Sequence, residues 1–175
     1  MTCRSLAETM APKFVTAWIQ EYDDELRESG ENSWVERARM SKSDAKAKQE
    51  WLLLCLAAYI QGCRSSMGES ELHFRFAGDF LEVFGREVEF QRIFPTAREF
   101  IELSKLRSTE YWSQLSESDP GRSIRLVAAR FLQNVGCSPI EIMQEMTIAS
   151  AFTYKATTTK DLFDKLKRTV RLVLS

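Results

Sequence analysis

The sequence predicts an all-α fold, a single compact globular bundle of about seven or eight helices with a hydrophobic central helix. Three observations favour it. Glycine and proline, which interrupt helices, are scarce, at seven and four of 175 residues. Apolar side chains recur mostly at spacings of three and four residues, the period of an amphipathic helix. Residues 51–60, WLLLCLAAYI, are apolar almost throughout, which is typical of a helix that other helices surround.

Length and composition indicate one soluble domain spanning residues 1–175. A chain of 175 residues is long enough to bury a real core, and it shows no internal repeat, low-complexity segment or linker. Its 44% hydrophobic and 28% charged residues are ordinary for a globular protein. The formal net charge of −1 disfavours a globally basic nucleic-acid-binding protein but leaves room for a local basic patch.

The apolar segments also bear on the compartment. The first residues, MTCRSLAETMAPKF, lack the continuous apolar segment of a secretory leader. The longest apolar run, residues 51–60, is too short to span a bilayer. We therefore expect no integral membrane segment and an intracellular protein, cytoplasmic or nuclear.

The first helix is predicted to begin near Pro12, since proline suits a first helical turn, and to stop at Ser29-Gly30. Its apolar stripe comprises Phe14, Val15, Trp18, Ile19, Tyr22 and Leu26. The polar segment 31–44 fits either a short helix or a loop.

The second clear helix opens at Ser43-Asp44 and is predicted to reach about Gly62. It contains the apolar run and is therefore the candidate central helix. Residues 63–70, CRSSMGES, are expected to form a loop.

Residues 72–85, LHFRFAGDFLEVFG, have helical apolar spacing, although alternation at their start also fits a short strand. Gly85 is expected to end this helix. Pro95-Thr96 is predicted to begin the next helix, which continues through or restarts at residues 109–115.

Residues 116–123 are the clearest turn, and an amphipathic helix ending at Gly136 is expected after them. Residues 138–141, SPIE, have the pattern of a capping box and predict a new helix start. A final helix is predicted from near Thr158, where Asp161 closes a second box.

The inventory of reactive residues argues against a metal site and against an enzyme. The four cysteines form no CxxC pair, and His73 is the only histidine, so we expect buried free thiols and no structural zinc. The Gly-rich phosphate loops and the GxSxG elbow are absent, and no motif surrounds His73. We expect no catalytic residue and no cofactor.

Two charge features remain. Residues 21–31, EYDDELRESGE, are acidic, whereas the C-terminal helix is basic, so the two could attract each other within the fold or between subunits. The basic residues of the C-terminal helix are Lys160, Lys165, Lys167, Arg168 and Arg171. A second set of arginines could line a groove for a phosphate backbone. These are Arg86, Arg92, Arg98, Arg107, Arg122, Arg125 and Arg130.

Residues 74–81, FRFAGDFL, resemble the death-motif helix of the Bcl family of apoptosis regulators. Residues 14–34, 90–100 and 119–131 are similar, in the family's order, to its first helix, the stretch after the death motif and the Gly-Arg of its central hairpin. The resemblance implies a hydrophobic groove that binds amphipathic helices, with Arg122 as its arginine. The partner-binding residues that it implies are Phe76, Gly78, Asp79, Phe100, Ile101, Arg122 and Val127.

The simpler interpretation of the Gly-Asp pair is structural. Gly78 would permit a close helix crossing, and Asp79 would be exposed or would cap a neighbouring helix. On either interpretation we expect a non-enzymatic helical interaction module, whose specific form is a Bcl-like regulator and whose partner is an amphipathic helix or a second copy. The alternative is a self-assembling protein of the viral coat or nucleocapsid type that coats nucleic acid through its arginines.

Overall fold

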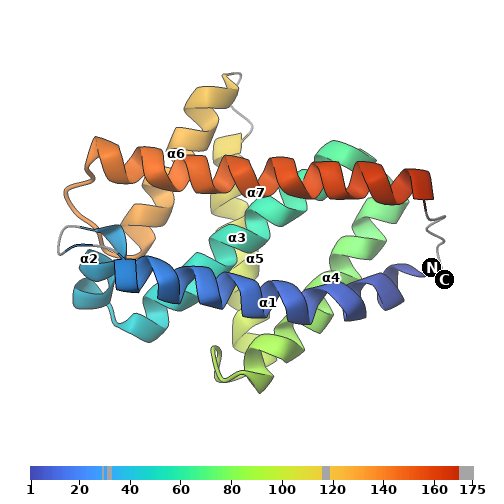
Figure 1. Ribbon diagram of the computed structural model, residues 1–175, viewed down its shortest axis with the longest axis horizontal. Helices are drawn as coiled ribbons and strands as arrows, with labels where there is room; N and C mark the ends of the chain where they lie inside the picture. Colours follow the sequence, from blue (N-terminus) through green and yellow to red (C-terminus); the bar gives the residue numbers. More distant parts are fainter. Residues whose placement is uncertain (29, 31–32, 116–118, 170–175) are drawn as a thin grey trace.

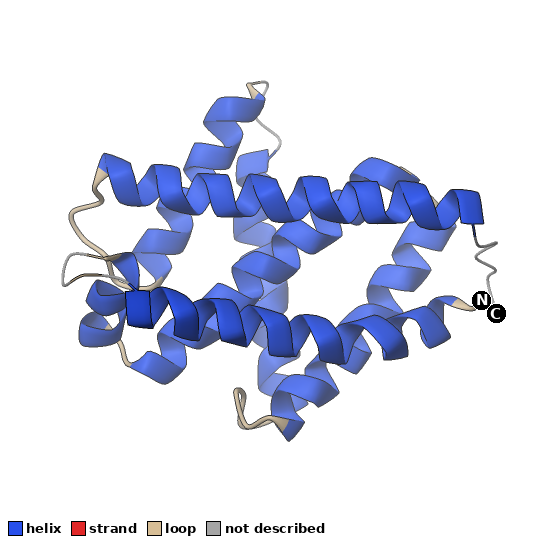
Figure 2. Ribbon diagram, viewed as in Figure 1, coloured by secondary structure: helices blue, strands red, loops and turns tan. Residues whose placement is uncertain are grey.

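The computed structural model describes residues 1–28, 30, 33–115 and 119–169, and these form seven helices and no strand (Figures 1 and 2). The helices are α1 (Cys3–Glu28), α2 (Trp34–Ser41), α3 (Asp44–Met67), α4 (Glu71–Phe90), α5 (Ala97–Leu115), α6 (Pro120–Asn134) and α7 (Ile142–Thr169). The all-α prediction is confirmed, and the alternative strand at residues 72–76 is helical. Among the described residues, none of the helices is long and apolar enough to cross a membrane.

The helices are arranged in layers around α3. In Figure 1, α1 and α7 run antiparallel along the long axis of the molecule, α3 crosses between them, and α4, α5 and α6 lie behind. The most extensive packing is that of α3 on α7 and of α1 on α4. The start of α1 and the end of α7 consequently lie at one end of the molecule, and α2 lies at the other.

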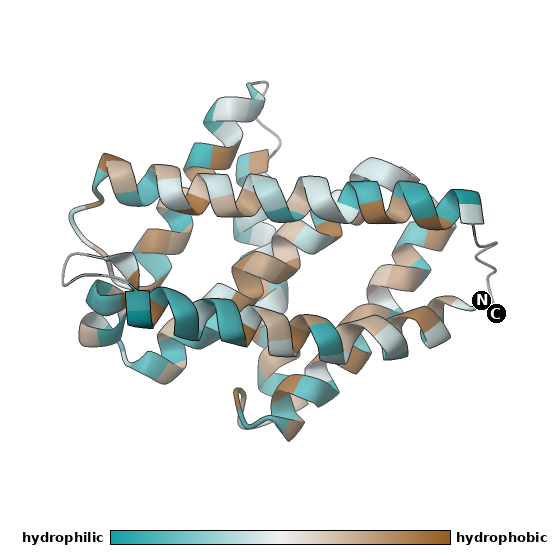
Figure 3. Cartoon of the chain, viewed as in Figure 1, coloured by the Kyte–Doolittle hydropathy of each residue, from teal (hydrophilic) through white to brown (hydrophobic). Residues whose placement is uncertain are grey.

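The prediction of a hydrophobic central helix is confirmed, because eight of the ten residues 51–60 are buried. Trp51 uses its indole N–H to donate a hydrogen bond of 2.9 Å to the carbonyl of Trp18 in α1. Tyr59 stacks on Phe80 of α4 with ring centroids 4.4 Å apart. The central helix therefore joins the front and back layers, as the brown band between α1 and α7 in Figure 3 illustrates.

The start of α1 and the end of α3 differ from the prediction. α1 begins at Cys3, and Pro12 lies inside it. A capping interaction at Thr2, whose hydroxyl accepts the amide of Ser5, starts the helix earlier than the proline suggested. α3 continues through Met67, and Gly68, with φ of 67°, ends it in place of Gly62.

The alternative of a short helix within residues 31–44 is confirmed by α2, which Ser33 caps by accepting the amide of Glu36. The start of α5 after Pro95-Thr96 is also confirmed, and Thr96 accepts the amide of Glu99. Ser29 and residues 116–118 lie outside the described residues.

The two helices predicted near residues 138 and 158 are one continuous helix, α7. The helix start predicted from the capping pattern at residues 138–141 is wrong, because tertiary contacts hold this segment outside the helix. Arg37 donates hydrogen bonds to the carbonyl of Pro139 and to the carboxylate of Glu141. Thr158 lies inside α7 and caps nothing. The helix therefore starts at Ile142 and extends past the other helices at its far end (Figure 1).

The glycines mark the closest helix contacts, but Gly78 is not one of them. An added Cβ at Gly78 would meet no atom within 4 Å, so the prediction of a close crossing there is wrong. At Gly85, which was expected to end α4, a Cβ would lie 3.0 Å from the Phe100 ring. At Gly62, a Cβ would lie 2.6 Å from the Cβ of Thr159 and 3.0 Å from the backbone nitrogen of Lys160. Gly62 is therefore the point at which α3 and α7 touch.

Candidate functional site

Three of the residues that the Bcl resemblance implied as partner contacts are part of the core. Phe76 is 1% exposed, and Phe100 and Val127 are fully buried. Phe100 packs between the rings of Phe84 and Phe94, with centroids 5.5 and 5.4 Å away. These side chains hold α4, α5 and α6 together and do not line an open groove.

The Gly-Asp pair is split between surface and interior. Gly78 is exposed, together with Phe74 on the preceding turn of α4. The side chain of Asp79 is 13% exposed and lies 3.5 Å from the Arg75 guanidinium on its own helix. Asp79 is thus directed into the fold, and the expectation that it is exposed is wrong; its charge acts on Cys3 at the start of α1, where burial and then Asp79 raise the pKa of the thiol.

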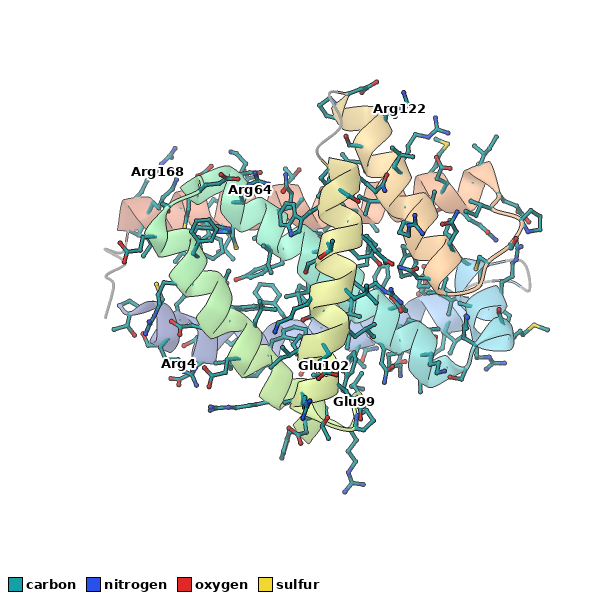
Figure 4. The ribbon with its side chains drawn as sticks, turned by 180° about the vertical axis from the view of Figure 1, so that it is seen from behind. Arg4, Arg64, Glu99, Glu102, Arg122 and Arg168 are labelled. Carbon is teal, nitrogen blue, oxygen red and sulfur yellow. The ribbon has the colours of Figure 1, made fainter. Side chains whose placement is uncertain are left out.

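Ile101 and Arg122 are not brought together either. Ile101 is half-buried on α5, whereas Arg122 is exposed near the protruding start of α6 (Figure 4). Arg122 lines an open depression of about 570 Å³ formed by α6 and Glu145 of α7. The residues that the resemblance implied therefore do not form one site in this structure.

A different surface combines charge with an open cavity. Four carboxylates, at Glu21, Asp24, Glu25 and Glu28, follow the helical spacing i, i+3, i+4 and i+7 and make one acidic stripe on α1. Glu25 and Glu28 lie in the last turn of α1, where the helix dipole disfavours negative charge by several tenths of a kcal/mol each, roughly. Fold stability alone does not account for acids at this end of the helix.

The acidic stripe forms one wall of a groove of about 330 Å³ between α1 and α7, which we call the α1–α7 groove. Its opposite wall consists of residues of α7 that are uncharged apart from Lys155, and its floor consists of tryptophans. The lining residues are Glu21, Asp24, Glu25, Glu28, Trp34, Trp51, Thr147, Ile148, Ala151, Tyr154 and Lys155.

The floor of the groove already holds one cation. Trp34 and Trp51 stack with ring centroids 5.4 Å apart, and the ammonium of Lys155 lies 5.4 Å from the Trp51 ring centroid. Lys155 also forms an ion pair with Glu21, and its side chain is only 11% exposed. The groove therefore offers both a carboxylate and an aromatic face to a positive charge.

The α7 wall continues into an exposed apolar surface. Ile142, Met143, Met146 and Tyr154 are between 54% and 72% exposed. From Ile142 to Thr159, the charged residues of α7 are Glu145 and Lys155, and each is paired, with Arg125 and Glu21 respectively. The outer face of this half of α7 is thus uncharged and carries large apolar side chains, which is a mark of interaction surfaces.

The sequence indicated the acidic wall of this groove but not its α7 wall. The acidic run at residues 21–31 was recognised, but its partner was sought among the basic residues of the C-terminal helix. Arg171 lies outside the described residues, and the structure places the other four at the far end of the molecule, while Lys155 and Lys48 pair with Glu21 and Asp23 instead. The position of the α7 wall beside α1 was missed, and α7 itself was predicted as two helices divided at Thr158.

The cysteines and the single histidine lie in the interior of the fold. All four cysteines are buried free thiols, and burial raises the pKa of each. In the described part of the chain, no group of three or more His, Cys, Asp or Glu residues is placed to hold a metal ion.

His73 is buried against Phe74, and this burial makes the stability of the fold depend on pH. Burial, and then the charge of Arg64, lowers the pKa of His73 below its ordinary value of 6.5. The unfolded chain therefore takes up a proton at a higher pH than the folded chain, so the free energy of unfolding should fall as the pH drops below about 6.5. Urea unfolding between about pH 5 and 8 measures this, and His73→Gln should flatten the profile near pH 6. A variant whose profile keeps the wild-type slope there would contradict the assignment.

Comparison of the chain with known protein families, with curated proteins and with solved structures finds no match in any of the three.

Proposed function

We propose that this protein is a non-enzymatic interaction module that binds a basic, amphipathic helical segment of a protein partner in the α1–α7 groove. The observation that carries the proposal is the pairing of the acidic stripe of α1 with the uncharged, apolar face of α7 across one open groove. The helix-in-groove mode agrees with the resemblance to Bcl-like regulators, but the surface is a different one.

The negative charge of the groove favours a positively charged partner. The lining carries four carboxylates, of which Glu21 pairs with Lys155 and Asp24 pairs with Arg27, so the excess of negative charge is that of two carboxylates. Lys155 is held between Glu21 and the Trp51 ring, and a partner's lysine or arginine would find carboxylates along the stripe and the exposed ring of Tyr154 across the groove. An acidic or neutral segment would gain neither.

The exposed apolar side chains supply the rest of the interface. A helix that presents lysines to α1 has its opposite face directed at the α7 wall, where Tyr154 is exposed; Met143 and Met146 are exposed on the turns of α7 before this wall and lie outside the groove lining. Methionine adapts its shape to different partners, and tyrosine offers a large rigid contact. The groove thus fits a helix with one basic face and one apolar face.

The nucleic-acid-coating alternative gains no support from the arginines that suggested it. Arg86, Arg98, Arg107 and Arg125 are paired with Glu82, Glu102, Glu50 and Glu145, respectively. Phosphate contacts would have to displace these carboxylates. Four of the seven arginines are therefore committed to the fold or its surface pairs.

Charge reversal in the groove tests the proposal. Titration with a labelled helical peptide that has one leucine face and one lysine face should show saturable binding. The double variant Glu25→Lys with Glu28→Lys should weaken this binding by at least about tenfold, because like charges placed opposite each other cost more than ~1.4 kcal/mol. Tyr154→Ala should weaken it through lost apolar contact.

The matched control is Glu89→Lys with Glu99→Lys, which makes the same change of net charge at exposed residues of the end of α4 and the start of α5, neither of which lines the groove; Figure 4 shows Glu99. This control should bind like the wild type. Equal weakening by both double variants would show that the peptide responds to net charge alone and would remove the groove from the proposal.

A further inference from the structure

The end of α7 offers the basic side chains that the α1–α7 groove is proposed to bind. Lys165, Lys167 and Arg168 are exposed, and Leu162 and Leu166, on the other side of the same turns, are half-buried and packed against the core of their own molecule. We call residues 162–168 the α7 tip. Lys167 is 3.3 Å from Asp164, whereas Lys165 and Arg168 form no ion pair with any described residue. The tip is therefore a basic, amphipathic helix end.

The groove and the tip of one molecule cannot meet. The acidic stripe lies at the end of α1 beside α2, and the tip lies at the opposite end of the long axis (Figure 1). Figure 4 shows Arg168 at the extreme end of α7, directed away from the other helices. Contact between these two charged surfaces therefore requires two molecules.

We infer that the partner of the groove is a second copy of this chain, whose α7 tip enters the α1–α7 groove. This inference rests on the proposed function, because it uses the same groove. Lys165 and Arg168 of one copy would approach Glu25 and Glu28 of the other. The complementary charges are the reason to prefer a second copy over another occupant.

The contact is head-to-tail, because it joins two different surfaces. Such an interface repeats from copy to copy and produces either a ring or an open chain of molecules. Exposed charges dominate it, so it should be weak and sensitive to ionic strength: the screening length falls from about 10 Å at 0.1 M salt to about 3 Å at 1 M.

Sedimentation equilibrium with two complementary variants tests the inference. The wild type should show an average mass that rises with concentration at low salt and returns to that of a monomer at high salt. The groove variant, Glu25→Lys with Glu28→Lys, and the tip variant, Lys165→Glu with Arg168→Glu, should each remain monomeric.

The mixture of the two variants is the decisive sample. The intact tip of the groove variant complements the intact groove of the tip variant, and the two reversed surfaces complement each other, so the mixture should regain the concentration-dependent mass that neither variant shows alone. One chain with all four substitutions should regain self-association, because both surfaces are then reversed in sign. A mixture that stays monomeric, or a wild type that is monomeric at low salt, would overturn the inference.

These outcomes are separable from those of the proposed function. If the wild type binds the basic peptide but does not self-associate, a second copy is excluded as the partner and the groove remains the proposed binding site. If the wild type does neither, both proposals are contradicted.

Discussion

Gly62→Ala is expected to lower the free energy of unfolding by about 2–3 kcal/mol, because the added methyl group has no space between α3 and α7. Its Cβ would lie 2.6 Å from the Cβ of Thr159 and 3.0 Å from the backbone nitrogen of Lys160, and it would also clash with the carbonyl of Ala156. Two of these atoms belong to the backbone, so a change of side-chain rotamer cannot relieve the clash. Alanine gains about 1 kcal/mol of helix propensity over glycine, which reduces the loss without cancelling it.

The matched control for this change is Gly78→Ala, in the middle of α4. An added Cβ there meets no atom within 4 Å, so the gain in helix propensity should appear as a stabilisation of about 0.5–1 kcal/mol. Urea unfolding monitored by circular dichroism measures both variants. Equal effects at the two positions would mean that the α3–α7 crossing at Gly62 is wrongly placed.

The same two glycines show what the sequence could and could not predict. Helix type followed from periodicity, and the central position of residues 51–60 followed from their uniform apolarity. Both features are local and were confirmed. The role of a glycine depends on which helix crosses it, so Gly62 was interpreted as a helix end and Gly78 as a crossing, and the structure contradicts both.

The candidate site shows the same limit. The acidic stripe was visible because four carboxylates at helical spacing form a local pattern. Its other wall depends on α7 lying antiparallel to α1, which no pattern within either helix encodes. Capping signals at residues 138–141 and at Thr158 divided α7 wrongly, since such signals compete with tertiary contacts like those of Arg37.

Arg107→Ala is expected to destabilise the fold by about 3–5 kcal/mol, the range for removal of one partner from a buried ion pair. The guanidinium of Arg107 in α5 contacts both carboxylate oxygens of Glu50 in α3, with its Nε 2.7 Å from Oε2. The Glu50 side chain is only 9% exposed and the Arg107 side chain 14% exposed. The sequence had grouped Arg107 with arginines able to contact phosphate, but its position leaves it committed to Glu50.

Arg98→Ala is the control on the same helix. Arg98 pairs with Glu102 at 2.9 Å, but its side chain is 87% exposed, so removal should cost no more than about 0.5 kcal/mol. Denaturant unfolding of the two variants compares a buried with an exposed pair of the same chemistry. Equal losses would show that water reaches Glu50 as freely as it reaches Glu102.

The double variant Glu50→Leu with Arg107→Met decides whether charge or packing explains the loss. Leaving Glu50 without its partner strands a buried carboxylate, whereas replacing both residues by apolar side chains of similar volume removes the charge and retains the contact between α3 and α5. The double variant should therefore be more stable than Arg107→Ala and close to the wild type. A double variant as unstable as the single one would assign the loss to packing around Arg107. Recovery would instead show that the pair specifies how α5 is placed on the central helix while adding little net stability.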